Sequence, residues 1–276
     1  MSYSGSMQTS GVCGLSSILS TPTNLTFMPY LYEIPSKKFL PDVKVINGIK
    51  QKNILAFGPH SDDLSIGAGG FLSHLAKNNK VVPVCGYTGW RGVNEAHSQD
   101  EAILIREKEM ARESKMLGAK KPIFLRLKTY ETETKKDKEN DIKKIELLLK
   151  KENPEIIFLP NPLDLHPRHK LLTQLVLRSL LKINKNVGIF FYEIPWSVFS
   201  GNEFNFIVPL SKDLVKQKIE AIKAHKSQLK RTNFVKLSKA LMSLRAGMVP
   251  EQKITGYGSN FSLSNWVEVY KYKTFK

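Results

Sequence analysis

From about Lys52 onward, short runs of β-branched and aromatic residues alternate with longer segments in which apolar residues recur at helical spacing. This alternation predicts repeated strand–helix–strand units and therefore a mostly parallel sheet. We expect an α/β, Rossmann-like doubly wound fold of strand order 3-2-1-4-5, with helices on both faces of the sheet. The strand-like runs are Ile54–Gly58, Val81–Tyr87, Ile123–Leu127, Ile156–Pro160 and Val187–Tyr192, and the helical segments between them are Ile66–Asn79, Gln99–Leu117, Asn140–Lys151 and Lys170–Ile183.

Residues 1–51 do not continue this pattern. They begin with a Ser/Gly-rich stretch and then carry four prolines without a clear hydrophobic period. We therefore expect residues 1–51 to form an N-terminal tail and an extended arm, and residues 52–276 to form a single domain. The hydrophobic fraction of 41% and the charged fraction of 24% are ordinary for a soluble globular protein, so the chain can bury a large core.

Cysteine content and hydropathy indicate the compartment. Cys13 and Cys85 are the only cysteines, and they give no disulfide framework, so we expect a reducing, cytoplasmic location. No run of residues approaches the roughly 18 apolar residues that a membrane span requires. The first residues also lack the basic start and apolar middle of a signal peptide.

The formal net charge is +17, and lysines spread over several predicted helices dominate it. Such a field can steer anionic substrates or polyanions toward the protein, or it can reflect a solvated surface without a specific partner. The lysines are not interleaved with aromatic residues, which argues against a nucleic-acid partner. The sequence does not decide whether the chain forms a homo-oligomer.

A short polar turn, Pro59–Asp63, follows the first strand-like run directly. It places the imidazole of His60 beside two neighbouring carboxylates, Asp62 and Asp63. Like charges side by side repel, and each carboxylate resists desolvation, so a folding argument does not require the pair. One acid could cap the next helix, but two acids and a histidine exceed what capping needs. The turn therefore predicts half of a metal site.

A second polar turn, with Asp164, His166 and His169, follows the fourth strand-like run. In the expected strand order, strands one and four are neighbours at the switch point, and ligands bind beyond their carboxyl ends. Histidine and carboxylate without cysteine suit zinc and other borderline divalent ions, and three protein ligands would leave a position for water. Three glycines that follow the first turn do not complete a phosphate-binding pattern, and we interpret them as close helix–sheet packing: Gly67, Gly69 and Gly70.

At these residues the chain resembles the PIG-L/LmbE-type family of metal-dependent N-deacetylases, which act mostly on N-acetylglucosamine-containing substrates. Pro59–Asp63 resembles the family's His-x-Asp-Asp turn, and His166–His169 resembles its HPDH-like turn. Thr88–Gly92 is similar to its Thr-Gly loop, Arg106–Glu109 to its Arg-x-x-Glu helix, and Lys218–Gln228 to its late Ala…His-x-Ser-Gln helix. The resemblance covers about residues 52 to 230.

Within this family the chain resembles most the deacetylase-like domains that are fused to glucosamine-6-phosphate deaminases. Tyr130–Thr132, after the third strand, and Val208–Ser211, before the late helix, carry that likeness. It implies an amino-sugar phosphate as a candidate substrate, which would suit the basic charge of the chain.

The resemblance implies a role for each site residue. Asp62, beside the metal but not bound to it, would be the general base. His166 would be the second catalytic group, stabilising the oxyanion or protonating the leaving amine, and Arg106 would position the substrate or brace the site. The implied ligands of Zn²⁺, or of another divalent metal, are His60, Asp63 and His169.

Arg168 departs from the family pattern, because the HPDH-like turn has an acid at this position. That acid would orient the catalytic histidine and raise its pKa, whereas an arginine would lower it. Either Asp164 takes over the orienting role, or His166 is a poorer acid, or Arg168 binds an anionic group of the substrate. The family's late Glu-x-Phe turn is also unclear, since Gly256–Phe261 keeps the aromatic residue without an obvious glutamate.

The expected function is therefore a zinc-dependent hydrolase that removes an N-acetyl group from an N-acetylglucosamine-type substrate, in either its free or its phosphorylated form, and releases acetate. Two alternatives remain open. A binding protein on the same scaffold would keep zinc and hold an anionic sugar or a polyanion. A metal-dependent phosphoesterase would need more carboxylates than the sequence displays in these turns, if it used two metal ions.

Overall fold

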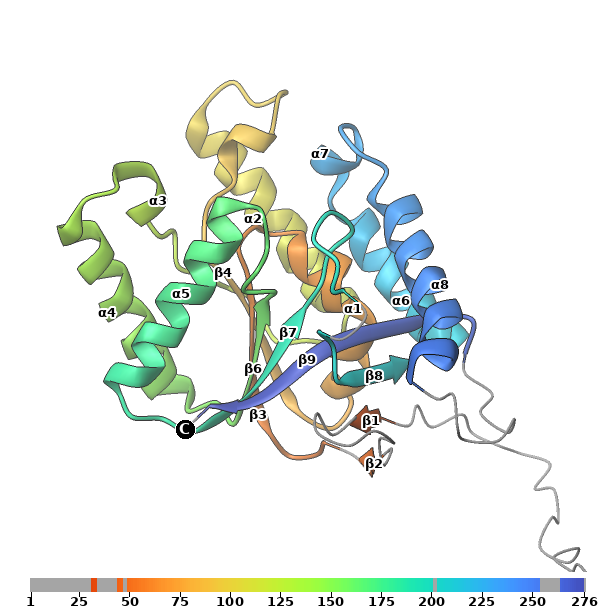
Figure 1. Cartoon of the computed structure of the whole chain (residues 1–276). Coiled ribbons are helices and arrows are strands. Elements are labelled where there is room, and N and C mark those ends of the chain that lie inside the picture. The colour runs from red at the N-terminus through yellow and green to blue at the C-terminus, as the bar shows by residue number, and fades with distance from the viewer. Residues whose placement is uncertain (1–30, 34–43, 47–48, 201–202, 254–263, 276) are drawn as a thin grey trace, which may run out of the picture.

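The protein contains one nine-stranded sheet with helices on both faces (Figure 1). The structure is a computed structural model, and it describes residues 31–33, 44–46, 49–200, 203–253 and 264–275. The strands are β1 (Leu31–Glu33), β2 (Lys44–Ile46), β3 (Asn53–Gly58), β4 (Lys80–Cys85), β5 (Ile123–Phe124), β6 (Ile156–Pro160), β7 (Val187–Tyr192), β8 (Phe206–Pro209) and β9 (Val267–Phe275). The helices are α1 (Asp63–Ala76), α2 (Gln99–Met116), α3 (Thr129–Thr132), α4 (Lys135–Glu152), α5 (Pro167–Lys182), α6 (Lys212–Lys223), α7 (Lys226–Leu229) and α8 (Phe234–Lys253), with a 3₁₀ turn η1 at Trp90–Gly92.

The predicted order of five parallel strands is confirmed. The sheet has the order β2-β1-β8-β9-β7-β6-β3-β4-β5, and β5-β4-β3-β6-β7 within it is the expected 3-2-1-4-5 core with parallel pairing throughout. The third strand is shorter than expected and ends at Phe124. Arg126 adopts a positive φ of 47°, which a regular strand does not accommodate, although Leu125 and Leu127 still donate to the β4 end of the sheet.

The sequence pattern did not predict the second half of the sheet. Strand β9 returns from the C-terminal part of the chain and pairs antiparallel with both β7 and β8. Strand β1 pairs antiparallel with β8 and with β2, so two short pieces of residues 1–51 join the sheet. Apart from residues 49–51, the other residues expected in the arm lie outside the described ranges.

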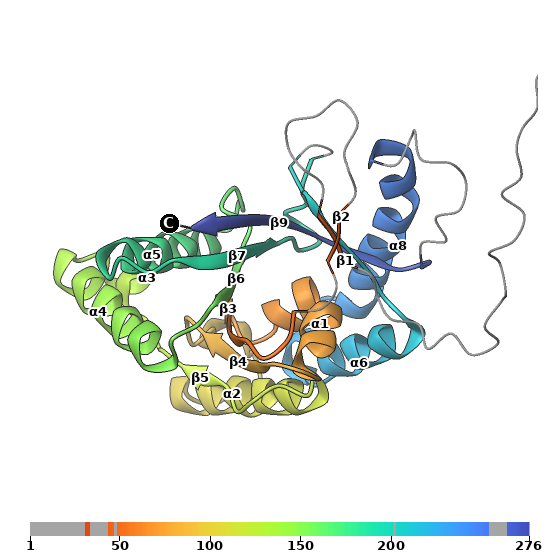
Figure 2. The ribbon, with the colours of Figure 1, turned by 90° about the horizontal axis from the view of Figure 1, so that it is seen from below.

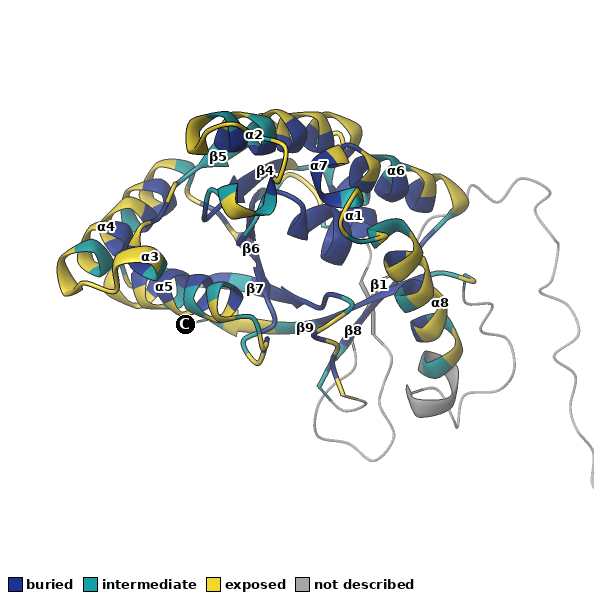
Figure 3. Cartoon of the chain, turned by 90° about the horizontal axis from the view of Figure 1, so that it is seen from above, coloured by how far each residue is buried: buried dark blue, intermediate teal, exposed yellow. Residues whose placement is uncertain are grey.

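Strand alternation divides the core into two apolar layers. Leu55 and Phe57 of β3 point toward the layer covered by α4 and α5, whereas Ile54 and Ala56 point toward the layer covered by α1, α2, α6 and α8. Figures 2 and 3 show these two groups of helices on opposite faces of the sheet, and in Figure 3 its central strands β3, β6 and β7 are largely buried. Within the described ranges, no helix has the length and apolar character needed to cross a membrane.

The interpretation of the α1 glycines as sites of close helix–sheet packing is confirmed for Gly67 and Gly70, whereas Gly69 packs against helix α6. A Cβ at Gly67 would overlap the ring of Tyr192 and lie 2.8 Å from the carbonyl oxygen of Glu193, at the end of β7. A Cβ at Gly69 would meet the Lys218 side chain on α6, and one at Gly70 would meet Leu210. Because α1 lies so close to β7, its first residues are held at the sheet edge where the polar turns lie.

We predict that Gly67→Ala destabilises the protein by about 1–3 kcal/mol, because the fixed backbone oxygen of Glu193 cannot move away from the added methyl group. The free energy of unfolding from urea titration measures this change. Gly247→Ala is the matched control, since Gly247 is exposed in α8 with nothing within 4 Å of the added Cβ. The control should be neutral, or stabilising by up to about 1 kcal/mol, because alanine is the better helix former. Equal effects of the two changes would contradict the packing argument.

Candidate metal centre

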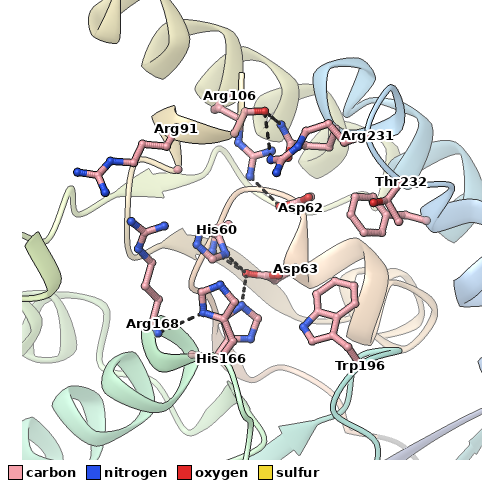
Figure 4. A pocket seen from close by; sticks show the side chains of 15 residues that line it. His60, Asp62, Asp63, Arg91, Arg106, His166, Arg168, Trp196, Arg231 and Thr232 are labelled. Carbon is pink, nitrogen blue, oxygen red and sulfur yellow. Dashed lines mark hydrogen bonds and ion pairs between the residues drawn. The ribbon is translucent and has the colours of Figure 1, made fainter. Parts of the chain in front are cut away.

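A cavity of about 490 Å³ opens beyond the carboxyl ends of β3 and β6 (Figure 4). Because these two strands pair directly, the turns that follow them face each other, although about a hundred residues separate them in the sequence. All seven residues singled out from the sequence line this cavity: His60, Asp62, Asp63, Arg106, His166, Arg168 and His169.

His60, Asp63 and His169 form a group that could hold a metal ion, with one ligand atom from each residue and all three atoms within 4.8 Å of one another. Asp63 Oδ2 lies 3.2 Å from His60 Nδ1 and 3.4 Å from His169 Nε2. Burial raises the pKa of Asp63, but the imidazoles of His169 and His60 and the hydrogen bonds from His60 outweigh it and hold the pKa well below its usual value.

The surroundings of His169 test whether the group suits a metal. His169 is fully buried, and its Nδ1 donates to Asp164 Oδ2 at 2.8 Å. Its Nε2 is buried without a hydrogen-bond partner among the described residues and lies beside Asp63. An imidazole whose far nitrogen is held by a carboxylate, and whose near nitrogen lacks a partner, is the usual state of a histidine metal ligand. The residues present therefore fit a divalent cation.

Asp62 lies beside this group but outside it. It occupies the N-cap position of α1 without making a side-chain cap hydrogen bond, and its Oδ1 accepts from Arg106 Nη2 at 2.8 Å. Both side chains are buried, with exposed fractions of 6% for Asp62 and 3% for Arg106. The ion pair directs one carboxylate oxygen toward α2, so the two neighbouring acids have different surroundings.

A buried network anchors the part of α2 that carries Arg106. Glu109 accepts from the backbone N–H of Ser227 at 2.8 Å and from its hydroxyl at 2.7 Å, and Glu113 pairs with His225 Nε2 at 2.5 Å. Burial raises the pKa of Glu113 even though His225 opposes the shift. The sequence showed Glu109 and His225–Gln228 only as motifs in the right order; the structure brings them into contact across α2 and α7.

His166 is the N-cap residue of α5, and its Nδ1 accepts from the backbone N–H of Arg168 at 3.2 Å. Burial and the neighbouring imidazoles of His169 and His60 lower its pKa to about 4, so the ring is neutral at pH 7. Because Nδ1 accepts a hydrogen bond, the proton of the neutral ring lies on Nε2. Asp164 contacts the backbone N–H of His166 at 2.8 Å and the ring of His169, not the ring of His166.

Sequence reasoning missed other residues of the cavity. Arg91 and Arg231 line it from η1 and from the segment after α7, and Trp196 lines it from the loop after β7. The Trp196 ring lies 5.8 Å from the ring of Phe234, which also lines the cavity. Only Arg91 had a signal in the sequence, because it belongs to the Thr88–Gly92 loop. The Gly256–Phe261 segment, where a late turn was sought, lies outside the described residues.

The doubly wound α/β fold thus places at its switch point a His/Asp/His group that could hold a metal ion, with a braced carboxylate beside it. Residues 55–180 match the family described as "PIG-L: GlcNAc-PI de-N-acetylase". The chain is 31% identical over 192 residues to the "Probable N-acetyl-alpha-D-glucosaminyl L-malate deacetylase 2" of Bacillus anthracis, covering 64% of this chain and 82% of that protein. The chain therefore belongs to the PIG-L family. It is an enzyme of the kind that cleaves an amide bond.

The similar solved structures support the fold of this chain but not its reaction. The N,N'-diacetylchitobiose deacetylase of Pyrococcus horikoshii superposes with a TM-score of 0.61 at 24% identity, covering 80% of this chain and 83% of that one. GalB, the 4-carboxy-2-hydroxymuconate hydratase of Pseudomonas putida, superposes with a TM-score of 0.62 at 16% identity, covering 81% of this chain and 96% of that one. Since a hydratase shares the fold, the fold by itself does not determine the reaction.

We predict that Asp164→Asn weakens divalent-metal binding by about 10- to 100-fold, because the negative charge that orients His169 and increases its basicity is lost. Competition with a chromogenic chelator for Zn²⁺ on the metal-stripped protein measures the affinity. Asp213→Asn, the same change at an exposed position of α6, is the control and should leave the affinity unchanged. A folded Asp164→Asn protein with wild-type affinity would show that Asp164 does not support a metal ligand.

Proposed function

We propose that the protein is a metal-dependent N-deacetylase that removes the acetyl group from an N-acetylglucosamine-type substrate. The observation that carries the proposal is the pair of adjacent carboxylates with separate partners. Asp63 lies in the three-residue group with His60 and His169, whereas Asp62 lies outside that group and is braced by Arg106. Acyl hydrolysis needs this division, because one group must hold the metal while another moves a proton.

His60, Asp63 and His169 would hold the ion, and two imidazoles with one carboxylate and no thiolate favour zinc over hard cations such as Mg²⁺. When bound, the ion would polarise the amide carbonyl and lower the pKa of a bound water toward neutrality. The same donor set accepts iron, cobalt or manganese, so zinc is the first expectation among several divalent ions.

The chain's own groups would complete the reaction. Asp62 takes a proton from the attacking water through the oxygen that Arg106 does not bind, and later delivers it to the leaving amine. His166 donates its Nε2–H to the developing oxyanion, because its Nδ1 is occupied by the Arg168 backbone N–H. Arg106 braces Asp62 through Nη2, while its Nε and Nη1 are buried without partners among the described residues. The products are acetate and a free amino sugar.

We predict that Asp62→Asn lowers kcat for acetate release by about 10²- to 10⁴-fold, because asparagine cannot accept the proton. Asparagine still offers Arg106 an acceptor, so the fold and one bound metal ion per chain should be retained, which thermal melting and metal analysis check. The control Asp100→Asn lies at an exposed position on α2 and should keep wild-type activity. Wild-type turnover in Asp62→Asn would show that Asp62 is not the base.

Removal of the metal is a second test. We predict that dialysis against a chelator abolishes acetate release and that stoichiometric Zn²⁺, or another divalent ion that binds the group, restores it. The order of recovery among Zn²⁺, Fe²⁺, Co²⁺ and Mn²⁺ identifies the preferred ion. Full activity in a preparation with no measurable metal would contradict the proposed metal centre.

The reaction itself is tested by product analysis with N-acetylglucosamine, N,N'-diacetylchitobiose and phosphorylated N-acetylglucosamine. Acetate release supports the proposal. Phosphate release without acetate would favour a phosphoesterase, and tight binding of the sugars without release of either product would favour a binding protein.

A further inference from the structure

Three arginines line the cavity without an acidic partner. Arg91, Arg168 and Arg231 form no ion pair among the described residues, whereas Arg106 in the same cavity is paired with Asp62. The two acids that line the cavity, Asp62 and Asp63, are already bound to Arg106 and to two imidazoles. The three guanidinium groups therefore leave the mouth of the cavity with an excess of positive charge.

Each of the three guanidinium groups has a partner that orients it without neutralising it. The Arg168 guanidinium lies 4.4 Å from the centre of the Tyr130 ring, and the Arg91 guanidinium lies 5.2 Å from the centre of the Trp90 ring. Arg231 Nη1 donates a long hydrogen bond of 3.4 Å to the Gly92 carbonyl oxygen. Stacking on a ring face leaves the edge of a guanidinium, with its N–H donors, available to a ligand.

Helix α5 adds to the positive potential. The helix begins at Pro167 beside the cavity, it has 16 residues, and its first turn contains no acidic residue but does contain Arg168. The positive end of the helix dipole therefore lies at the cavity, where Asp164 accepts from the backbone N–H of the N-cap residue His166 and Arg168 adds a further positive charge. In the view of Figure 4, Arg91 and Arg168 lie on one side of the metal group, and Trp196 lies on the opposite side.

We propose that Arg91, Arg168 and Arg231 form an anion-binding subsite, so that the N-acetylated amino sugar taken by this enzyme carries a phosphate or carboxylate group. A guanidinium binds either group through paired N–H donors, and three guanidinium groups that line one cavity add their positive charge there. The sugar ring would lie between this subsite and the apolar wall of Trp196 and Phe234, with its acetamide at the metal group. This inference rests on the proposed deacetylase function.

Substrate selectivity tests the subsite. Acetate release is measured for N-acetylglucosamine, its 1-phosphate, its 6-phosphate and the carboxylate-bearing N-acetylmuramic acid. We expect kcat/KM for at least one anionic sugar to exceed that for N-acetylglucosamine, with the difference mainly in KM and reduced by added salt. The comparison of phosphate with carboxylate sugars identifies the acidic group. Equal kcat/KM for the neutral and all the anionic sugars would overturn the proposal.

Substitutions assign the selectivity to the three arginines. Arg91→Gln, Arg168→Gln and Arg231→Gln should each lower the ratio of anionic to neutral kcat/KM by about 10- to 100-fold, which is the effect of one lost charge-assisted contact. Arg178→Gln is the matched control, because Arg178 is exposed on α5 and does not line the cavity. The control removes the same unit of net charge and should leave the ratio unchanged. If all four variants behave alike, only the general basic field is acting, and the proposal fails.

A binding measurement separates this inference from the deacetylase proposal. Titration of the metal-loaded protein with inorganic phosphate and with glucosamine 6-phosphate, followed by tryptophan fluorescence or calorimetry, does not depend on turnover. Saturable binding that Arg91→Gln and Arg231→Gln weaken and Arg178→Gln does not weaken supports the subsite even if no acetate is released. Acetate release together with absent or arginine-independent binding would overturn the subsite and leave the proposed reaction intact.

Discussion

The rest of the site depends on how the chain accommodates two adjacent buried carboxylates at the start of α1. Two like charges on neighbouring residues repel, and burial also removes their hydration. The chain offsets this cost with different partners, because Arg106 pairs with Asp62, and the imidazoles of His60 and His169 surround Asp63. Neighbouring residues of one type thus acquire separate environments, which is the condition for separate chemical roles.

These separate environments require elements from distant parts of the chain to keep fixed positions relative to one another. Direct pairing of β3 with β6 brings His169 to Asp63, and Asp164 fixes both the His169 ring and the His166 backbone. Helix α2 must also stay in place, since it carries Arg106. Its buried Glu109 accepts from Ser227 of α7, and its buried Glu113 pairs with His225, which precedes α7. The packing of α1 against β7 supplies the remaining constraint. Loss of any of these contacts would weaken the core and would also displace one of the two carboxylates, Asp62 or Asp63.

Strand–helix alternation and two polar turns predicted the parallel core and placed six of the seven cavity residues at one edge of the sheet, whereas Arg106 was found only through the resemblance of its helix to the family's Arg-x-x-Glu motif. Local patterns carry that information, because a strand end and the turn after it are contiguous in sequence. The antiparallel half of the sheet was not predictable in this way, since β9 pairs with strands separated from it by long stretches of chain. Arg231 and Trp196 were missed for the same reason: each is one residue in an unremarkable loop, and only tertiary packing directs it into the cavity.

A hydratase and deacetylases share this architecture, so the side chains at the switch point must decide the reaction. Arg168 illustrates how this chain can change its substrate without changing its chemistry. An acid at position 168 would offset the positive end of the α5 dipole and repel an incoming anion, whereas the Arg168 guanidinium adds positive charge there and stacks on Tyr130. Asp164 meanwhile supplies the carboxylate that the His169 imidazole requires. Asp164 does not contact the His166 ring, so that ring lacks the carboxylate that the family pattern places at position 168, and its pKa stays lowered. In the proposed reaction His166 therefore acts as a neutral donor, and the charge at position 168 is left to act on the substrate.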